Sequence, residues 1–513
     1  MSQSLKPNPA LLRAKIKHIV VLMLENRSFD NLLGWLYEGR RTADGQEFEG
    51  LTADLWNPLD NIDSDGLSFV EKVPVEKNGQ SKTHFGKPVA NPVNFSQPTP
   101  DPGEGYADTN HQLFQRYQVG AQFPPAPVNM GFVQNYQNAM LYGAYSFGDA
   151  PGDPRQIMRC YTPEQTPVLS TLAKCFAVCD HYHASVPSQT LPNRAFVHAA
   201  TSGGNVNNSP NALCTAKTIF NQLQDAIDAG NTALSWGIFG NNLLSASGAR
   251  QPGDSNGSFD GGHFSLTRLA MTALHPARFD GNFGTLNDFY AKCSSGALPS
   301  YTFLEPQYGG PGQNDQHPPQ DIRPGEALIA NIYNAIKLSP AFNDTLLIIT
   351  YDEHGGCYDH VAPPSGAKAP DASKPPGQQG FLFNRFGVRV PAVLVSPYIR
   401  KGLVARPEGF VPFDHTSIIK TVQTCFGLTS DLTERSAAAP DFSCVLSDAP
   451  PRCDDIPKVQ PLAFETAIDP AAVNELHRVM AAIIEQQTGA TCPSDAEMIA
   501  FVQQNYSRIF RGS

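Results

Sequence analysis

Side chains with oxygen atoms follow two apolar segments of this sequence at the point where each segment ends. The run Ile19–Leu24 has the length and composition of a strand buried on both faces, and Glu25 and Asn26 come directly after it. The run Thr345–Thr350 leads to the pair Asp352–Glu353 in the same way. Carboxylate and amide oxygens are the ligands that hard divalent cations prefer. The two pairs therefore predict a cation site.

A hydroxyl group joins this set. The stretch "SVPSQTLPNR", which follows a third apolar run, contains Thr190 and Arg194. In open α/β sheets, ligands bind at the carboxyl ends of the strands, so we expect Thr190 to lie near both acidic pairs. A structural alternative remains for each pair. Glu25 could cap a helix predicted in "RSFDNLLGWL", because a helix dipole favours an acid there, and the second pair could be turn residues.

The elements that must position these side chains follow from the hydrophobic pattern. Short apolar runs alternate with helical patterns, which predicts an α/β fold with a mostly parallel central sheet flanked by helices. The stretch "PGEALIANIYNAIKLSP" is the expected crossover helix between two parallel strands. The expected strands are Ile19–Leu24, Ala177–Tyr182, Ser235–Phe239, Tyr301–Leu304, Thr345–Thr350 and Ala392–Val395.

The chain of 513 residues is expected to form one large domain over residues 15–445 and a helical C-terminal segment, residues 446–513, packed on it. Insertions rich in Pro, Gly or Ser are expected near residues 42–105, 245–262 and 362–380, as rims of the cleft. In the C-terminal segment, Asp469 and Pro470 predict the start of one helix, to about Gln487. Ser494–Glu497 reads as a capping box that opens a second helix, to about Phe510.

Composition excludes several classes of partner. The net charge of -11 argues against nucleic acid and against binding to anionic membranes. No apolar run approaches the roughly 20 residues that span a bilayer, and the first residues lack a signal-peptide pattern. The ten cysteines include no C-x-x-C pair, so zinc-site spacing is absent. Disulfides are expected only if the protein is exported, and buried thiols are the alternative.

Four motifs together resemble a known family. They are "IVVLMLENRSFDNLLG", "SVPSQTLPNR", "NDQHPPQDIRPGE" and "ITYDEHGGCYDHV". They are similar to segments of the bacterial non-zinc phospholipase C and acid phosphatase family, which belongs to the alkaline-phosphatase-like superfamily. The resemblance extends from about Lys17 to Gly427. It differs in two respects: family members usually carry a twin-arginine export signal, and the haemolytic lipases have further C-terminal domains.

The resemblance implies roles for individual residues. Thr190 matches the family's nucleophile, which also touches the metal, and Arg194 is expected to orient its loop. Three histidines also match histidines of the family. His317 matches closely, whereas the sequence around His111 and His263 is less distinctive. The residues that match the family's metal ligands are Glu25, Asn26, Asp352 and Glu353, so one divalent cation with oxygen ligands, Ca²⁺ or similar, is expected.

These assignments predict a phosphoesterase in which Thr190 attacks phosphorus and a histidine, His317 first and His263 second, protonates the leaving group. The expected activity is that of a phospholipase C on diesters of the phosphatidylcholine type, through a phosphothreonine intermediate. Acid phosphatase activity on soluble monoesters and non-catalytic cation binding remain alternatives. The expected partners are a phospholipid or small phosphoester, with at most peripheral membrane contact. The expected location is cytoplasmic, or secreted or periplasmic as is usual in the family.

Overall fold

The computed structural model describes residues 5–62, 68–80, 82–84, 87–89, 92–120, 125–142, 152–241, 264–371, 374–464 and 473–510. The predicted insertion 245–262 and His263 lie outside these residues.

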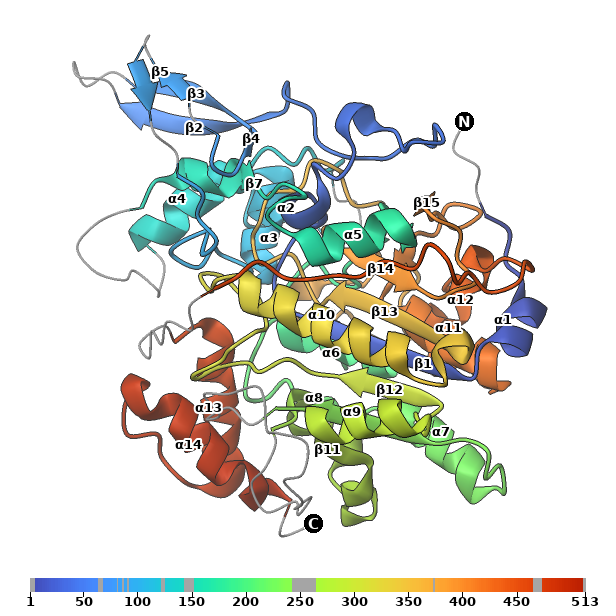
Figure 1. Ribbon diagram of the computed structural model, residues 1–513. Helices are drawn as coiled ribbons and strands as arrows, with labels where there is room; N and C mark the ends of the chain where they lie inside the picture. Colours follow the sequence, from blue (N-terminus) through green and yellow to red (C-terminus); the bar gives the residue numbers. More distant parts are fainter. Residues whose placement is uncertain are drawn as a thin grey trace.

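An eight-stranded sheet organises the molecule (Figure 1). Its three central strands are all parallel, with β1 (His18–Leu24) between β12 (Tyr301–Leu304) and β13 (Thr345–Tyr351), whereas β14 (Ala392–Val395) runs antiparallel to β13 and to β8 (Ala177–Val178). The predicted mostly parallel sheet is confirmed. In spatial order, the strands are β11 (Phe283–Thr285), β10 (Trp236–Gly240), β12 (Tyr301–Leu304), β1 (His18–Leu24), β13 (Thr345–Tyr351), β14 (Ala392–Val395), β8 (Ala177–Val178) and β15 (Leu403–Val404).

One predicted strand is interrupted. The run Ala177–Tyr182 contributes only β8 to the large sheet, and its end forms β9 (Tyr182–His183), which pairs with β16 (Phe413–Asp414) in a separate two-stranded sheet. Asp180 lies between the two pieces and accepts hydrogen bonds from the guanidinium of Arg406 at 2.8 and 2.6 Å. This ion pair, whose carboxylate is buried, lies at a turn of the chain that an apolar pattern does not reveal.

Helices cover both faces of the sheet (Figure 1). The predicted crossover helix is α10 (Arg323–Leu338), and it packs against α5 (Pro167–Cys175) and α9 (Leu286–Ser295) on one face. On the other face lie α6 (Thr190–Ala199), α7 (Ile219–Asp228) and α11 (His415–Phe426). The apolar residues of β1 and all of β13 are buried, as expected for strands covered on both sides.

The segment predicted as an insertion over residues 42–105 contains an antiparallel pair, β2 (Trp56–Ile62) with β3 (Ser68–Pro74), and β2 packs on α4 (Phe132–Tyr142) beside the sheet. The remaining α-helices and strands outside the C-terminal segment complete the fold. They are α1 (Pro9–Lys15), α2 (Phe29–Leu33), β2 (Trp56–Ile62), β3 (Ser68–Pro74), β4 (Glu76–Lys77), β5 (Lys82–His84), β6 (Lys87–Val89), α3 (Tyr106–Phe114), α4 (Phe132–Tyr142), β7 (Arg159–Cys160), α8 (Leu266–Ala270) and α12 (Glu434–Ala438).

The C-terminal segment forms α13 (Glu475–Thr488) and α14 (Met498–Asn505), which share a second apolar cluster with α8 and Tyr308. The start predicted for the first helix falls outside the described residues, and the described helix is capped by Asn474. The predicted capping box is wrong, because the Ser494 hydroxyl bonds the Glu497 carboxylate rather than a backbone N–H. Among the described residues, we find no helix with the length and apolarity needed to cross a membrane.

Candidate active site

Five polar residues meet at the carboxyl edge of the three central strands. Glu25 and Asn26 follow β1, Asp352 and Glu353 follow β13, and Glu305 follows β12; all five are buried. Because these strands are adjacent and parallel, their ends lie side by side. The backbone N–H of Asn26 donates to Asp352 Oδ1 at 3.1 Å, which ties two of the ends together. Glu305 was not predicted, although it follows its strand by the same rule.

The chain turns sharply at Asn26, two residues after β1, and at Gly355, four residues after β13. Asn26 has a φ of 50°, a left-handed conformation that asparagine tolerates better than most residues. Gly355 has a φ of 59°, and a Cβ atom there would lie 2.2 Å from the carbonyl oxygen of Asn26. Its backbone N–H donates to Glu353 Oε2 at 2.6 Å. Glycine is therefore required at position 355 for the two strand ends to approach each other.

Thr190 is the first residue of α6, and its hydroxyl donates to Glu25 Oε2 at 3.3 Å. The loop before it is fixed by Asn193, whose amide donates to the carbonyls of Val186, Ser188 and Gln189 at 2.9 to 3.1 Å. This buried amide sets the position at which the helix begins. The nucleophile predicted from the resemblance thus lies beside a predicted metal ligand.

Arg194 lies one helical turn after Thr190 and faces the same way. Its Nε donates to Asp352 Oδ2 at 3.3 Å, and its guanidinium also bonds Glu25 Oε1. Its guanidinium carbon lies 5.2 Å from the centre of the Tyr308 ring. Burial raises the pKa of Glu25, whereas Arg194 opposes that shift. Arg194 was expected to orient a loop, and the structure shows instead that it bridges two of the predicted metal ligands.

His317 is buried next to Asn26. Its Nδ1 lies 2.6 Å from the carbonyl oxygen of Pro318, an acceptor, so Nδ1 carries the proton. Nε2 is then an unprotonated nitrogen, and it accepts from the Asn26 amide at 3.0 Å. Burial lowers the pKa of His317 to about 3, so the ring is neutral at physiological pH. In this state Nε2 presents a lone pair rather than the proton expected of a general acid.

Two acidic residues missed by the sequence analysis lie beside His317. Glu104 Oε2 accepts from the Asn26 amide at 2.5 Å and lies 3.9 Å from His317 Nε2. Asp101 Oδ1 lies 3.7 Å from His317 Nδ1. Burial raises the pKa of both carboxyls, and the charges of nearby acids, Glu353 for Glu104 and Glu475 for Asp101, raise them further. The sequence "DPGEGY" has a loop-like composition, which gives no signal that its acids turn inward.

Several buried oxygens at this edge find no hydrogen-bond donor among the described residues. Burial, and next the charge of Asp352, raise the pKa of Glu353, which contributes one of these oxygens. Such atoms are costly in a protein interior unless a cation or a proton satisfies them. The atoms are Asn26 Oδ1, Asp101 Oδ1, Glu104 Oε1 and Glu353 Oε1.

Other predicted residues lie elsewhere. His111 is on α3, with its ring centre 4.4 Å from that of Tyr117, and no contact among the described residues joins it to the strand ends. His263 lies outside the described residues. Ser28, not Glu25, caps the helix α2, which removes the structural alternative for Glu25. All ten cysteines are described, and all are free thiols.

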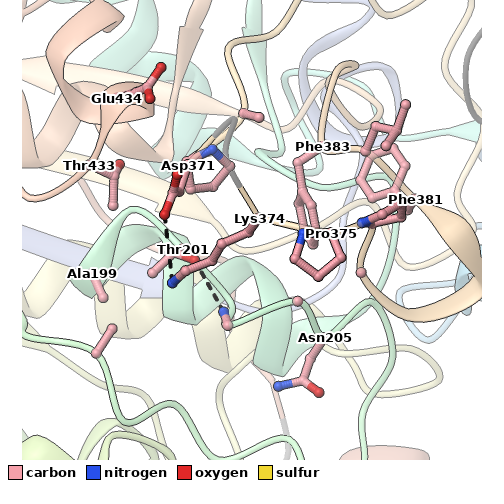
Figure 2. Close-up of a pocket in the computed structure, with 18 of the residues that line it drawn as sticks. Ala199, Thr201, Asn205, Asp371, Lys374, Pro375, Phe381, Phe383, Thr433 and Glu434 are labelled. Atoms are coloured by element: carbon pink, nitrogen blue, oxygen red, sulfur yellow. Dashed lines mark hydrogen bonds and ion pairs between the residues drawn. The ribbon is translucent and has the colours of Figure 1, made fainter.

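The loop predicted at residues 362–380 lines a different cavity, of about 770 Å³. Figure 2 shows Phe381 and Phe383 on one side of it and Ala199 and Thr201 on the other, with the Lys374 side chain extending toward Thr201. Ala199 is the last residue of α6 and Thr190 the first. The helix therefore separates this cavity from Thr190 by about 14 Å, at 1.5 Å per residue.

Comparison with known proteins identifies the class. The Phosphoesterase family matches residues 16–429. Non-specific phospholipase C3 of Arabidopsis thaliana is 33% identical over 453 residues, which cover 86% of this chain and 75% of the relative. Phospholipase C B of Mycobacterium tuberculosis is 28% identical, with coverage of 85% and 78%. A putative sulfatase from Bacteroides thetaiotaomicron aligns over 56% of this chain and 70% of its own at 12% identity and a TM-score of 0.33, too distant to bear on function.

Together with the carboxylates at the strand ends and the buried Thr190 hydroxyl, these matches show that the protein is a phosphoric ester hydrolase. The chain belongs to the Phosphoesterase family.

Proposed function

We propose that this protein is a metal-dependent phosphodiesterase of the phospholipase C type, with Thr190 as its nucleophile. The observation that carries the proposal is the position of the Thr190 hydroxyl, buried at the start of α6 and 3.3 Å from Glu25 Oε2. A site that only bound a structural cation would have no need of a hydroxyl there. The N-terminal end of a helix also favours the negative charge of a phosphoryl group.

The residues at the strand ends fit a divalent cation. Asn26 Oδ1 and Glu353 Oε1 are buried oxygens without a donor among the described residues, and the donor set consists of oxygens that hard cations prefer. Glu25, Asn26, Asp352, Glu353 and the Thr190 hydroxyl would hold the ion. When bound, the cation would lower the pKa of the hydroxyl and offset charge on the phosphoryl oxygens.

The chain's own groups suggest how the reaction proceeds. Glu25 Oε2 accepts the hydroxyl hydrogen of Thr190, so it is placed to take the proton as the Thr190 oxygen attacks phosphorus. A bond forms between Thr190 Oγ1 and phosphorus as the bond to the leaving alkoxide breaks, and the alkoxide takes a proton from water. Arg194 keeps the Glu25 and Asp352 carboxylates in place throughout. Water then cleaves the phosphothreonine and regenerates the hydroxyl.

The proposed substrates are diesters of the phosphatidylcholine type, which would release diacylglycerol and a phosphorylated head group. Support comes from relatives named non-specific phospholipase C and phospholipase C B. The alternative is a phosphatase acting on soluble monoesters. The two activities predict different ratios of kcat/KM for the diester p-nitrophenyl phosphorylcholine and the monoester p-nitrophenyl phosphate. A preference for the monoester above about tenfold, about 1.4 kcal/mol, would favour the phosphatase.

The decisive variant is Thr190→Ala. It should lose several orders of magnitude in kcat with an unchanged melting temperature, while Thr190→Ser keeps part of the activity. Thr201→Ala is the matched control, because it removes a hydroxyl just beyond the opposite end of α6. If Thr190→Ala turns over substrate at the wild-type rate, Thr190 is not the nucleophile, and direct attack by water on phosphorus becomes the mechanism.

A further inference from the structure

A buried arginine without a counter-charge lines a cavity away from the strand ends. Arg385 forms part of the wall of a cavity of about 500 Å³, together with Phe114 and two segments rich in proline, residues 125–127 and 362–365. Only 3% of Arg385 is exposed. None of these residues belongs to the strand-end site or lines the cavity of Figure 2. Cavities of this volume commonly hold small ligands, so the chemistry of the lining indicates what it binds.

The guanidinium of Arg385 uses only one of its three nitrogens. Nη2 donates to the Tyr106 hydroxyl at 3.0 Å and to Asn110 Oδ1 at 2.5 Å, and both acceptors are on α3. Nε and Nη1 are buried and find no acceptor among the described residues. Buried donors of this kind are costly unless a partner satisfies them. Two nitrogens of a fixed guanidinium are therefore available to a ligand in the cavity.

Other buried arginines of this protein are paired with carboxylates. Arg389 lies 2.9 Å from Asp359, and Arg435 lies 3.1 Å from Asp414. No carboxylate of the described residues forms such a pair with Arg385, and burial lowers the pKa of Arg385. A buried charge normally requires an opposite charge. An anion from solution would supply the charge that the chain does not.

Aromatic rings give Arg385 a partial structural role. The guanidinium carbon lies 5.0 Å from the centre of the Phe381 ring and 5.4 Å from those of Tyr106 and Phe114. The faces of these rings attract a cation, which explains why an arginine is tolerated here. A phenyl ring, however, offers only a weak acceptor for an N–H group. The rings therefore account for the position of the guanidinium and leave Nε and Nη1 without a strong acceptor.

The walls of the cavity are apolar and held by the chain itself. Apart from Arg385 and Ser365, the lining consists of phenylalanine, proline and alanine. The Asn129 amide donates to the carbonyls of Asp359 and Val361, at 2.9 and 3.0 Å, and so joins the ends of the two segments rich in proline. The site is thus built before any ligand enters, with one cationic group in an apolar surrounding.

We propose that this cavity binds an organic monoanion with an apolar body, whose acid group accepts hydrogen bonds from Nε and Nη1 of Arg385. A single guanidinium compensates a single negative charge, and guanidinium binds carboxylate and phosphate oxygens well. The apolar body would lie against Phe114 and the prolines. A fatty carboxylate and the phosphodiester of a lipid both have this chemistry. Binding here does not depend on Thr190 or on a bound cation.

Calorimetric titration of the full chain tests the two halves of the ligand. Octanoate should bind at one site per chain, and acetate and octanol, which each lack one half, should bind at least about tenfold more weakly. Dibutyl phosphate distinguishes the two sources, because it carries the same charge on a phosphodiester: the tighter of the two anions identifies the acid group. Equal affinity for acetate or octanol, or no binding of either anion, overturns the proposal.

Ser365 offers a matched pair of variants that leaves Arg385 in place. It is exposed and lies opposite Arg385 in an isolated antiparallel bridge, so the two side chains share a face. Ser365→Glu should bring a carboxylate to the guanidinium and weaken octanoate binding by about tenfold or more. Ser365→Gln has the same size without the charge, and its Kd should stay within about threefold of wild type. Equal Kd values in the two variants contradict the proposal.

Arg385→Met removes the charge and keeps an apolar side chain of similar length. Octanoate binding should be lost, with a melting temperature that shows the variant to be folded. Wild-type octanoate affinity in folded Arg385→Met would mean that the arginine serves the fold through Tyr106 and Asn110 and does not bind a ligand. If this variant does not fold, the comparison of Ser365→Glu with Ser365→Gln decides the question.

Discussion

Two buried clusters in this protein contain the same kinds of residue and differ in charge compensation. One is Asp101, Glu104 and His317, the mixed cluster beside the strand ends. The other is Asp30, Asp359 and His360, which we call the arginine cluster because Arg389 lies within it. Each has two carboxyls and an imidazole within 4.8 Å of one another.

In the arginine cluster the carboxylates are matched by donors. Arg389 donates from Nε to Asp359 Oδ1 and from its terminal nitrogen to Asp30 Oδ1, both at 2.9 Å. His360 adds its backbone N–H and its Nδ1 to Asp30, at 2.7 and 2.6 Å. A guanidinium therefore already provides the positive charge that a metal would bring. Residue types alone do not distinguish a structural ion pair from a cation site. Buried oxygens without a donor do, and Asp30 and Asp359 have none among the described residues.

The largest effect is expected from removing that arginine. Arg389→Met leaves Asp30 and Asp359 buried without a counter-charge, which typically destabilises a protein by about 3–5 kcal/mol. Urea unfolding should show this loss, and the number of ions bound per folded chain should not change. A stability within 1 kcal/mol of wild type would mean that the arginine cluster is not held by its ion pairs.

Removing metal should affect the strand-end site and not the arginine cluster. If a cation binds at the strand ends, where Glu104 holds the Asn26 amide, it stabilises the folded state by about 2.7 kcal/mol at a concentration 100 times its Kd. Thermal unfolding with and without chelator should show the difference in wild type and in Arg389→Met, and a smaller one in Glu104→Gln. An equal chelator effect in Glu104→Gln would mean that the bond from the Asn26 amide to Glu104 does not support metal binding.

Glu326 is a third buried carboxyl for this comparison, because its donors among the described residues are all backbone N–H groups. It accepts from the N–H groups of Val168 and Leu169 at the start of α5, at 2.7 and 3.2 Å. Burial raises its pKa to about 8, against an ordinary value of 4.5. Between these values the folded state holds a proton that the unfolded state releases, so stability falls as pH rises, by about 1.4 kcal/mol per pH unit.

Glu326→Gln should remove that slope. Between pH 6 and pH 7 the free energy of unfolding of wild type should fall more steeply than that of the variant. Chemical denaturation at the two pH values measures both. Parallel slopes would show that Glu326 is ionised in the folded protein and that its two backbone donors are sufficient compensation.

The sequence predicts the strands and helices that carry local signals. β1 and β13 are continuous apolar runs, and α10 has a helical period, so each appears as expected. The acidic pairs after the two strands follow from their position alone. Glu305 could have been found by the same rule, because it follows the apolar run that forms β12.

The remaining parts depend on contacts between distant segments. Asp101 and Glu104 come from a loop more than two hundred residues before His317, and nothing in "DPGEGY" indicates which acid turns inward. The ion pair of Asp180 with Arg406 interrupts a predicted strand for the same reason. Charge compensation by a distant arginine is a property of the fold, so a local sequence pattern does not contain it.

The smallest effect concerns an acid at the edge of the mixed cluster, Glu475, the first residue of α13. Its carboxylate accepts from the Asn208 amide at 2.5 Å, and the Asn208 side-chain oxygen accepts from the backbone N–H of Leu191 at 2.8 Å. This chain of hydrogen bonds joins the C-terminal helix to the first turn of α6, next to Thr190. Burial raises the pKa of Glu475, so its charge is not well compensated either.

Variants at this position separate its hydrogen bond from its charge. Glu475→Gln keeps an acceptor for Asn208, whereas Glu475→Ala removes it. If Glu475 acts by positioning Thr190, Glu475→Ala should lose about fivefold in kcat, roughly 1 kcal/mol, with KM little changed, and Glu475→Gln should retain most activity. If its charge matters instead, as part of an acidic wall shared with Glu104, both variants should change KM for p-nitrophenyl phosphorylcholine equally. Steady-state kinetics of the two variants therefore decides whether a carboxylate without an arginine partner acts here by geometry or by charge.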